Sequence, residues 1–441
     1  MTDYEKLLTG KESPFEVEQI IYSVTDRTGK IIDINQVFQH VSKYDPNELL
    51  GSPHSLLRHP KMPRGVFKLM WDTILANKRF GGYVVNRAKN GDHYWVFACV
   101  VPIKDKFISF RIKPMFKTVF ERIQKVYELV LEEEAKAQKP TEQANLSFSA
   151  LVSHIEKLGF ANYEKFWKWV FLNEFLQRLN HYNLTSAINL IQDRGKAVQL
   201  EYLNRVFLEF KNPLSRLVEA YERSLNLEGL GKALKQVSLN LSIRAKKIGD
   251  TGTTLDCIST ELRRFSDYLE LSTSGVKDQV SELIEQFFDF ATWLLCNLLV
   301  EEANLWRGYQ NDKDSVSTTN GASNLALSDV DQLVTETLDR ILATGLEFKI
   351  DELSSVADRF LRFEKNLNFI TVSGRVESSR LEESESFWAL LAQVEEQAHF
   401  LNKLAYDLSQ LGITLKQLVF MVLCNSKNSQ SKEPHNALQV G

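Results

Sequence analysis

The feature that most constrains the fold is a change of hydrophobic period near Lys117. Upstream of it, short apolar runs alternate with turn signals, whereas downstream apolar residues recur every three or four positions over long stretches. A period of two is typical of strands, and a period near 3.6 is typical of helices. The pattern therefore predicts a small domain that contains a sheet, followed by a long region built only of helices.

Two hairpins and one amphipathic helix are predicted in the first domain, residues 15–114. The run VEQIIYSVTDRTGKIIDIN turns at Asp26-Arg27-Thr28-Gly29, and GYVVNRAKNGDHYWVFACVVPIK turns at Asn90-Gly91, where glycine suits the positive φ of a tight turn. Between them, PRGVFKLMWDTILANK spaces apolar residues four apart behind a proline, which favours a helix. A last strand, KFISFRIK, completes an α+β domain: a five-stranded antiparallel sheet with short helices on one face.

The rest of the chain divides at its polar breaks into helical segments. FKTVFERIQKVYELVLEEEAKAQ predicts an exit helix over Met115 to Lys136, and KPTEQANLS is interpreted as its break. The stretch GYQNDKDSVSTTNGASN has no apolar face and predicts a linker. The predicted segments are a flexible N-terminus 1–14, the sheet domain 15–114, a helical linker region 115–200, a helical hairpin 201–305, a polar linker 306–326, C-terminal helices 327–425 and a disordered tail 426–441.

Composition argues against several classes of protein. The 441 residues, 44% of them hydrophobic, can form real cores, and a formal net charge of −4 argues against nucleic-acid binding, because phosphate contacts need a basic surface. The most apolar stretches, FFDFATWLLCNLLV and LKQLVFMVLC, are shorter than the ~20 residues of a membrane span. The charged N-terminus lacks the apolar core of a signal peptide, so a cytoplasmic location is expected. No nucleotide-binding, hydrolase or metalloprotease motif occurs, so the chain is not expected to be an enzyme.

The most informative local feature is the run LLRHPKMP, which sets Arg58 and His59 ahead of two prolines. The simpler interpretation is a proline-shaped loop in which His59 caps a helix, but a guanidinium and an imidazole near a sheet can also hold an anionic or heterocyclic ligand. The order of the elements favours the ligand. Residues 15–113 resemble PAS domains and, among these, the flavin-binding sensor domain of bacterial aerotaxis receptors, through the runs INQVF, VSKYDPNELLGSPHSLLRHPKMP, Met70-Trp71 and VVNRAKNGDHYWV.

This resemblance implies a cytoplasmic redox sensor that holds FAD without a covalent bond. The residues that it places at the flavin are Asn35, His54, Arg58, His59, Phe67 and Asn86. Two positions depart from the family: Lys61 stands where an acidic residue usually follows RHP, and Phe80 stands where a tryptophan usually precedes the third strand. Both departures bear on whether FAD is retained. A histidine-ligated haem in the same pocket and a domain without any cofactor remain open alternatives.

A second resemblance lies in SLNLSIRAKKIGDTGTTLDCISTELRRFS, which predicts two helices joined by a glycine break and packed antiparallel. Its residue types resemble the signalling tip of methyl-accepting chemotaxis receptors. Arg244 replaces a glutamate of that family, and this charge reversal opposes the family's contacts with a histidine kinase and a coupling protein. We therefore expect a degenerate tip that serves dimerisation or partner binding. The tip positions that the resemblance implies are Asn240, Arg244, Gly249, Gly252 and Glu261.

These features together predict a cytoplasmic signal transducer that senses redox state, oxygen or energy through its PAS domain. A change at the ligand is expected to shift the exit helix and to alter the contacts of the helical bundle with partner proteins, in a process related to chemotaxis or aerotaxis. A homodimer through the helical region is expected, and engagement of a chemotaxis kinase is open. The alternatives are a scaffold or adaptor with a ligand-free PAS domain, and a haem-containing oxygen sensor.

Overall fold

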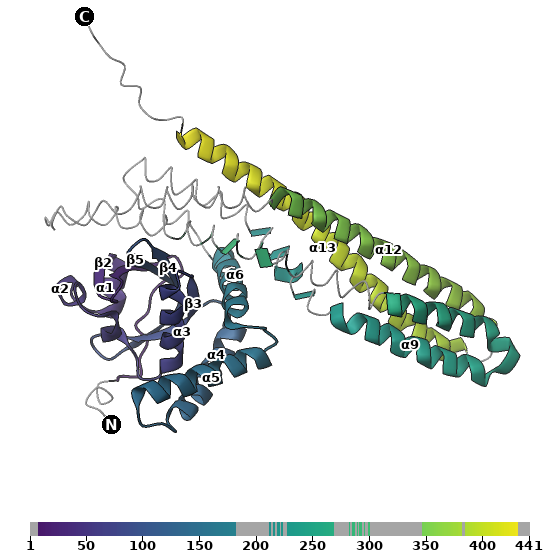
Figure 1. The fold of residues 1–441 in the computed structure, drawn as a ribbon, viewed down its shortest axis with the longest axis horizontal. Helices are drawn as coiled ribbons and strands as arrows, with labels where there is room; N and C mark the ends of the chain where they lie inside the picture. The colour runs from purple at the N-terminus through teal and green to yellow at the C-terminus, as the bar shows by residue number, and fades with distance from the viewer. Residues whose placement is uncertain are drawn as a thin grey trace, which may run out of the picture. The chain divides into compact units, whose positions relative to one another are not determined.

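In the computed structural model, the described residues are 8–181, 227–268, 346–381 and 384–430, together with scattered positions between 211 and 299 (Figure 1). The chain forms two compact units. The first is built of Met1–Lys211 with Phe288–Glu336, and the second of Asn212–Phe287 with Thr337–Gly441. The predicted polar linker, 306–326, lies outside the described residues.

A five-stranded antiparallel sheet forms the core of the first unit, as predicted. The strands follow the order β2-β1-β5-β4-β3, so β5 is central and β3 lies at an edge. Both predicted hairpin turns place a glycine in the left-handed region, Gly29 at φ 84° and Gly91 at φ 88°. The strands are β1 (Ile21–Asp26), β2 (Ile31–Ile34), β3 (Phe80–Arg87), β4 (His93–Ile103) and β5 (Lys106–Ile112).

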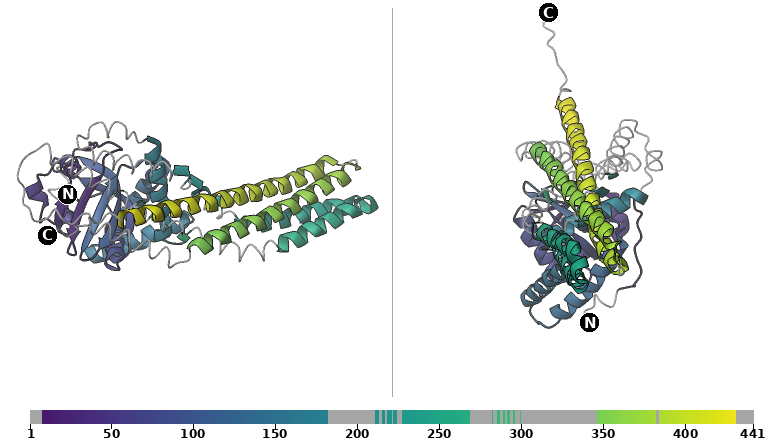
Figure 2. Two further views of the ribbon diagram at one scale, coloured as in Figure 1. Left: turned by 90° about the horizontal axis from the view of Figure 1, so that it is seen from above. Right: turned by 90° about the vertical axis from the view of Figure 1, so that its right-hand side faces the viewer.

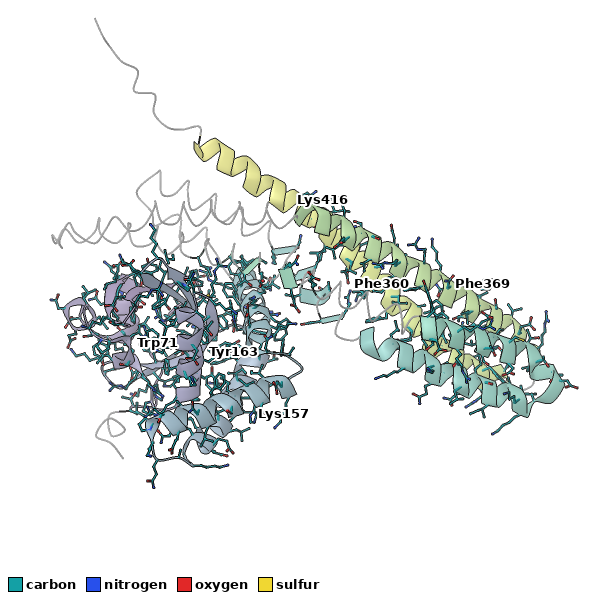
Figure 3. The ribbon with its side chains drawn as sticks, in the orientation of Figure 1. Trp71, Lys157, Tyr163, Phe360, Phe369 and Lys416 are labelled. Atoms are coloured by element: carbon teal, nitrogen blue, oxygen red, sulfur yellow. The ribbon has the colours of Figure 1, made fainter. Side chains whose placement is uncertain are left out.

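Short helices cover one face of the sheet, which we call the inner face. The helix predicted after Pro63 is confirmed, and its Trp71, labelled in Figure 3, meets Phe107 of β5 edge to face with the ring centroids 5.9 Å apart. Phe38 and His54 lie over the same face, with their rings stacked 6.1 Å apart. The four helices are α1 (Gln36–Ser42), α2 (Pro46–Leu49), the 3-10 helix η2 (His54–Leu57) and α3 (Arg64–Leu75).

Three more helices pack onto the same unit: α4 (Lys117–Glu134), α5 (Pro140–Lys157) and α6 (Tyr163–His181). Helices α4 and α6 cover the second face, the outer face, where Trp95 stacks on Tyr127 and Phe97 stacks on Phe171. The segment that was expected to be a linker is therefore packed against the sheet, and the sheet carries helices on both faces instead of one. The physical reason is that β3 is buried at every position, so both of its faces need cover.

The predicted break at KPTEQANLS is wrong in its position. Helix α5 begins at Pro140, because proline is well suited to the first turn of a helix, and residues 135–139 alone separate it from α4. Helix α5 packs against α3 at Gly65, whose backbone N–H donates to Ser147 Oγ at 2.6 Å. A side chain at Gly65 would clash with the backbone of Phe148, so the close approach of the two helices requires glycine.

The second unit contains the predicted antiparallel helical hairpin. Helix α9 (Leu227–Lys247) leads into the 3-10 turn η3 (Gly249–Gly252), and residues 253–268 form the returning helix. Hydrogen bonds from Ser266 Oγ to Gly231 O, 2.7 Å, and from Ser242 Oγ to Asp256 Oδ1, 2.5 Å, join the two arms. Apolar residues at helical spacing line the contact between the two arms. Those that are buried are Leu230, Leu234, Val237, Leu241, Leu255 and Leu262, whereas Ile258 and Phe265 are half-buried.

Helices α12 (Leu346–Ser378) and α13 (Ser384–Gln430) form a second antiparallel pair, and the figure shows them side by side with α9 (Figure 2). Asp351 near the start of α12 pairs with Lys416 of α13 at 2.6 Å, and Gly374 near its end packs on Leu391. Helix α13 continues beyond Cys424, so residues 426–430 of the predicted disordered tail are helical. Among the helices of the described ranges, none is long and apolar enough to cross a membrane.

Candidate functional site

The inner face of the sheet carries the candidate site. Side chains alternate between the two faces along each strand, so the outward-facing aromatic residues fix which positions face inward. The strand register places Asn86 of β3 opposite Tyr94 of β4, and Arg111 of β5 opposite Ala98 of β4. The inner face is unusually polar for a sheet covered by helices, and its buried polar side chains include Ser23, Asn86, Tyr94, Ser109 and Arg111.

Three of these side chains have a buried polar atom without a hydrogen-bond partner among the described residues: Asn86 Nδ2, Tyr94 Oη and Ser109 Oγ. Asn86 and Tyr94 are direct cross-strand neighbours, so two of the three atoms belong to adjacent side chains. A buried polar group without a partner costs about 1–3 kcal/mol. Such groups are rare in folded proteins and need an explanation, and one explanation is that a bound ligand forms the missing hydrogen bonds.

Arg58, a predicted ligand residue, lies at the edge of β3 beside Asn86. The two residues form an isolated antiparallel bridge, which ties the loop after η2 to the strand. The Arg58 guanidinium lies 4.8 Å from the ring centroid of Phe67 and donates to Met62 O at 3.0 Å. Burial, and secondarily Arg64, lowers its pKa, while Glu134 acts in the opposite direction. The predicted residues Arg58, Phe67 and Asn86 are thus neighbours at one edge of the sheet.

His59 is buried, at 5% exposure, but its ring lies beside His93, with the centroids 6.1 Å apart. Its Nδ1 accepts from the Lys61 backbone N–H at 3.1 Å, so the ring proton of the neutral form is on Nε2. Burial, and then the nearby His93, lowers the pKa of His59 to about 4. At neutral pH the imidazole is therefore uncharged, and its ring lies beside Lys61 and His93.

His54 lies over the centre of the inner face. Its Nε2 is 2.6 Å from Arg111 Nη2, and because a guanidinium can only donate, Nε2 is the acceptor and the ring proton is on Nδ1. Burial, and then the charge of Arg111, lowers the pKa of His54 to about 3. The structure thus holds this predicted ligand residue as a neutral imidazole against a buried cation.

Asn35 is buried, and its side chain is engaged by the protein backbone. Its Oδ1 accepts from the N–H groups of Phe38, 3.0 Å, and Tyr22, 3.1 Å, and its Nδ2 donates to Ile20 O at 2.7 Å. The residue caps helix α1 and fixes it to β1. The predicted contact of Asn35 with a flavin stays a prediction. The hydrogen bonds of this amide to the backbone already give it a structural role that does not depend on a flavin.

The two positions that depart from the resemblance have different surroundings. Lys61 is exposed in the loop after η2. Phe80 is buried, and its ring stacks on Tyr163 of α6 with centroids 5.7 Å apart and an interplanar angle of 9°. Tyr163, labelled in Figure 3, also donates to Gly81 O at 3.1 Å, so α6 closes this end of the edge strand. The aromatic ring at position 80 is used for packing against the helix that follows the sheet domain.

The predicted tip residues in the second unit fall into two groups. Gly249 has φ 71°, and a side chain at Gly252 would clash with Ala245 O, so both glycines are needed for the turn itself. Asn240, Arg244 and Glu261 are exposed, and Arg244 Nη1 donates to Ser386 O of α13 at 3.3 Å. The structure therefore places the three polar tip residues on the surface of the hairpin.

Reasoning from the sequence missed four buried polar residues of the inner face: Arg111, Tyr94, Ser109 and Ser23. A usable signal was present in KFISFRIK, where Phe107, Ser109 and Arg111 alternate and must share a face. A serine and an arginine on the face that helices cover are out of place in a purely apolar core.

Known proteins match the N-terminal part of the chain. Residues 31–107 match the family model described as PAS fold. The aerotaxis receptor of Escherichia coli (strain K12) is 42% identical over 96 residues, which are 22% of this chain and 19% of the receptor. The nitrogen fixation regulatory protein of Klebsiella pneumoniae is 28% identical over 88 residues, 20% of this chain and 18% of that protein. The chain thus spans about a fifth of the length of these curated relatives.

Among solved structures, the chain matches the LOV domain from Erythrobacter litoralis EL346 blue-light activated histidine kinase. It superimposes with a TM-score of 0.20 at 16% sequence identity, covering 21% of this chain and 94% of that domain.

Proposed function

The N-terminal domain is a PAS domain, and we propose that it binds a flavin, most simply FAD, on the inner face of its sheet and reports the state of that flavin to the helices behind it. The observation that carries the proposal is the adjacent pair of unsatisfied buried groups, Asn86 Nδ2 and Tyr94 Oη. The 42% identity with a protein named aerotaxis receptor supports it. We propose a cytoplasmic signalling protein with no enzymatic activity of its own.

The residues present fit a flavin. The heterocyclic ring presents carbonyl oxygens and ring nitrogens at its edge and a flat apolar face, and it supplies reversible uptake of electrons. Asn86 Nδ2 can donate to a carbonyl oxygen, and the Tyr94 hydroxyl can donate or accept. Arg58 and Phe67, at the strand edge beside Asn86, can hold a further polar group and an apolar surface.

The outer face offers a route from the site to the exit helix. Tyr83 lies on β3 three residues before Asn86, on the opposite face, and its hydroxyl donates to Glu174 Oε1 at 2.5 Å. Glu174 Oε2 accepts from the backbone N–H groups of Met115, 2.6 Å, and Phe116, 3.0 Å, immediately before α4. A displacement of β3 caused by a ligand is therefore passed through one carboxyl group to the start of the exit helix.

The second unit is proposed to transmit the signal by association with a second copy or with a partner protein. Helix α12 exposes an apolar stripe, Phe369 (74% exposed), Val372 (61%) and Val376 (51%), at the spacing of three and four that suits a coiled-coil contact. We propose a homodimer through this helical unit. Sedimentation of the full chain should show a dimer that the Phe369→Lys variant loses, and a wild-type monomer at all concentrations would contradict this assembly.

Engagement of a chemotaxis kinase and its coupling protein through Asn240, Arg244 and Glu261 stays a prediction. The second candidate function is a scaffold with a ligand-free PAS domain. It is favoured by the packing of Phe80 on Tyr163, which commits this ring to α6. A haem-containing sensor is the third candidate, and one spectrum separates the three.

The test is an absorption spectrum of the purified full chain before and after incubation with FAD. A flavin gives bands in the blue, a haem gives a Soret band, and a scaffold gives neither. Replacing Arg58 and His59 together by alanine should remove at least about nine tenths of the bound chromophore, because loss of one charged hydrogen bond alone lowers affinity about tenfold. Lys78→Ala, an exposed residue in the turn after α3, is the matched control. Absence of a chromophore in the wild type after incubation refutes the flavin proposal.

A further inference from the structure

We propose that Arg111, at the centre of the inner face, is an anion-recognising residue that selects ligands presenting a negatively charged oxygen to the sheet. Arg111 lies on the central strand β5, and it is only 4% exposed. The inference rests on the proposed function, because it names the ligand class that this same site accepts.

The partners of Arg111 are all uncharged. Its Nη1 and Nη2 donate to Ser23 Oγ at 3.1 and 3.2 Å, and Nη2 also donates to His54 Nε2 at 2.6 Å. The guanidinium carbon lies 5.3 Å from the ring centroid of Phe38. These contacts fix the plane of the guanidinium, but none of them balances its charge.

No carboxylate of the described part of the chain lies within ion-pair distance of Arg111, and the Tyr94 hydroxyl is the neighbouring group that favours its charged form. Burial lowers the pKa of Arg111 to about 10, so the group still carries its charge at neutral pH. A buried cation without a counter-charge is strongly unfavourable, and proteins normally pair such a group or neutralise it. We infer that the negative charge that balances Arg111 comes from a group outside the sheet domain.

The donors around Arg111 match an oxyanion. Three of the hydrogen bonds that the five N–H groups of a guanidinium can donate are accounted for, so further donor capacity remains. The Tyr94 hydroxyl, on the neighbouring strand β4, has no hydrogen-bond partner in the described part of the chain and is an additional donor. A guanidinium together with a hydroxyl binds a charged oxygen more strongly than neutral donors do. The Nε2 atom of His54 already accepts a hydrogen bond from Arg111, and its ring is neutral. Arg111 is therefore the group that supplies positive charge for recognition of an anion here.

The charged oxygen has two sources in a flavin nucleotide: the phosphate groups, or the ring system when reduction gives it negative charge. The experiment measures binding of FAD, FMN and riboflavin to the full chain by quenching of flavin fluorescence, for the wild type, Arg111→Gln and Arg111→Lys. Arg111→Gln should weaken FAD binding at least about tenfold, and Arg111→Lys, which keeps the charge, should stay within a few-fold. Thermal unfolding of the ligand-free variants checks that both are folded.

The three ligands distinguish the sources. A loss for oxidised FAD and FMN with unchanged riboflavin assigns the contact to phosphate. A loss for all three flavins that is larger after reduction with dithionite, followed by absorption, than in the oxidised state assigns the contact to the negatively charged ring, and either outcome supports the inference. A loss that is equal for all three flavins and unchanged by reduction overturns it. Wild-type affinity of Arg111→Gln for every flavin overturns it while leaving the flavin function intact. If the wild type binds no flavin, the proposed function fails, and the anion site is then decided by thermal shift with inorganic phosphate. Stabilisation of the wild type and Arg111→Lys but not of Arg111→Gln supports it, and no stabilisation of the wild type overturns it.

Discussion

Two groups of buried polar side chains, one on each face of the sheet, differ in whether their hydrogen bonds are made. On the outer face, the carboxyl group of Glu174 is bonded to Tyr83 and to two backbone N–H groups. On the inner face, Asn86 Nδ2 and Tyr94 Oη have no partner among the described residues, and Arg111 has neutral partners only. A face that serves folding satisfies its polar groups, whereas a face that serves a ligand leaves some of them for the ligand to satisfy.

The largest effect is expected on the outer face. Glu174→Ala leaves the Tyr83 hydroxyl and two N–H groups without an acceptor in buried surroundings, so we expect the free energy of unfolding to fall by about 3–4 kcal/mol. Glu174→Gln keeps an acceptor and a donor and should lose less than half of that. Urea unfolding measures both. The matched control is Glu164→Ala, an exposed carboxylate on the same helix, with an expected loss below about 1 kcal/mol. If Glu164→Ala and Glu174→Ala lowered the free energy of unfolding equally, the hydrogen bonds of Glu174 would not be the stabilising feature of the outer face.

The pH dependence sharpens the same contrast. Burial raises the pKa of Glu174 from 4.5 to about 7, although hydrogen bonds from Tyr83 and the two N–H groups oppose the rise. Between these two pH values the folded state binds a proton that the unfolded state has released. This raised pKa therefore stabilises the folded state by about 3 kcal/mol below about pH 4.5, and the contribution is lost as the pH rises through 7.

Glu174→Gln cannot titrate, so the difference in unfolding free energy between the wild type and this variant should change across that window. The lowered pKa of His54 has the opposite sign, since its stabilisation is present above pH 6.5 and is lost as the pH falls toward 3. His54 is present in both proteins, and the subtraction removes its effect. A difference that stays constant from pH 4 to pH 8 would show that the pKa of Glu174 is the same in the folded and unfolded states.

The smallest change in stability is expected on the inner face. Asn86→Leu removes an amide whose Nδ2 is unbonded within the ranges that the structure describes, so the free energy of unfolding of the ligand-free protein should stay unchanged or rise by up to about 1 kcal/mol. The same variant should bind FAD at least about tenfold more weakly. Asn35→Leu is the matched control, because that buried amide is fully bonded to backbone groups, and it should lose about 2–3 kcal/mol. Similar losses at both positions would remove the distinction between them.

Much of the sheet domain follows from local sequence. The turns at Gly29 and Gly91 and the helix behind Pro63 depend on residues close together in the chain, and all three are present where the pattern predicts them. The site is less accessible to such reasoning. His54 and Arg111 are 57 positions apart, and their contact depends on how η2 lies over β5. Asn35 matches a ligand-binding position by sequence, but its hydrogen bonds to the backbone of β1 are visible only in the fold.

The sequence by itself determined the order of the elements, the two hairpins, the sheet domain and the helical hairpin around Gly249 and Gly252, because periodicity and turn residues act locally. Only the tertiary structure decided that α4 and α6 cover the outer face. Strand β3 is buried on both faces, and its sequence does not specify which segments bury it. It also decided that Arg111 is buried with no carboxylate of the described residues as its counter-charge. Charge compensation depends on distances in space, and spacing along the chain does not encode them.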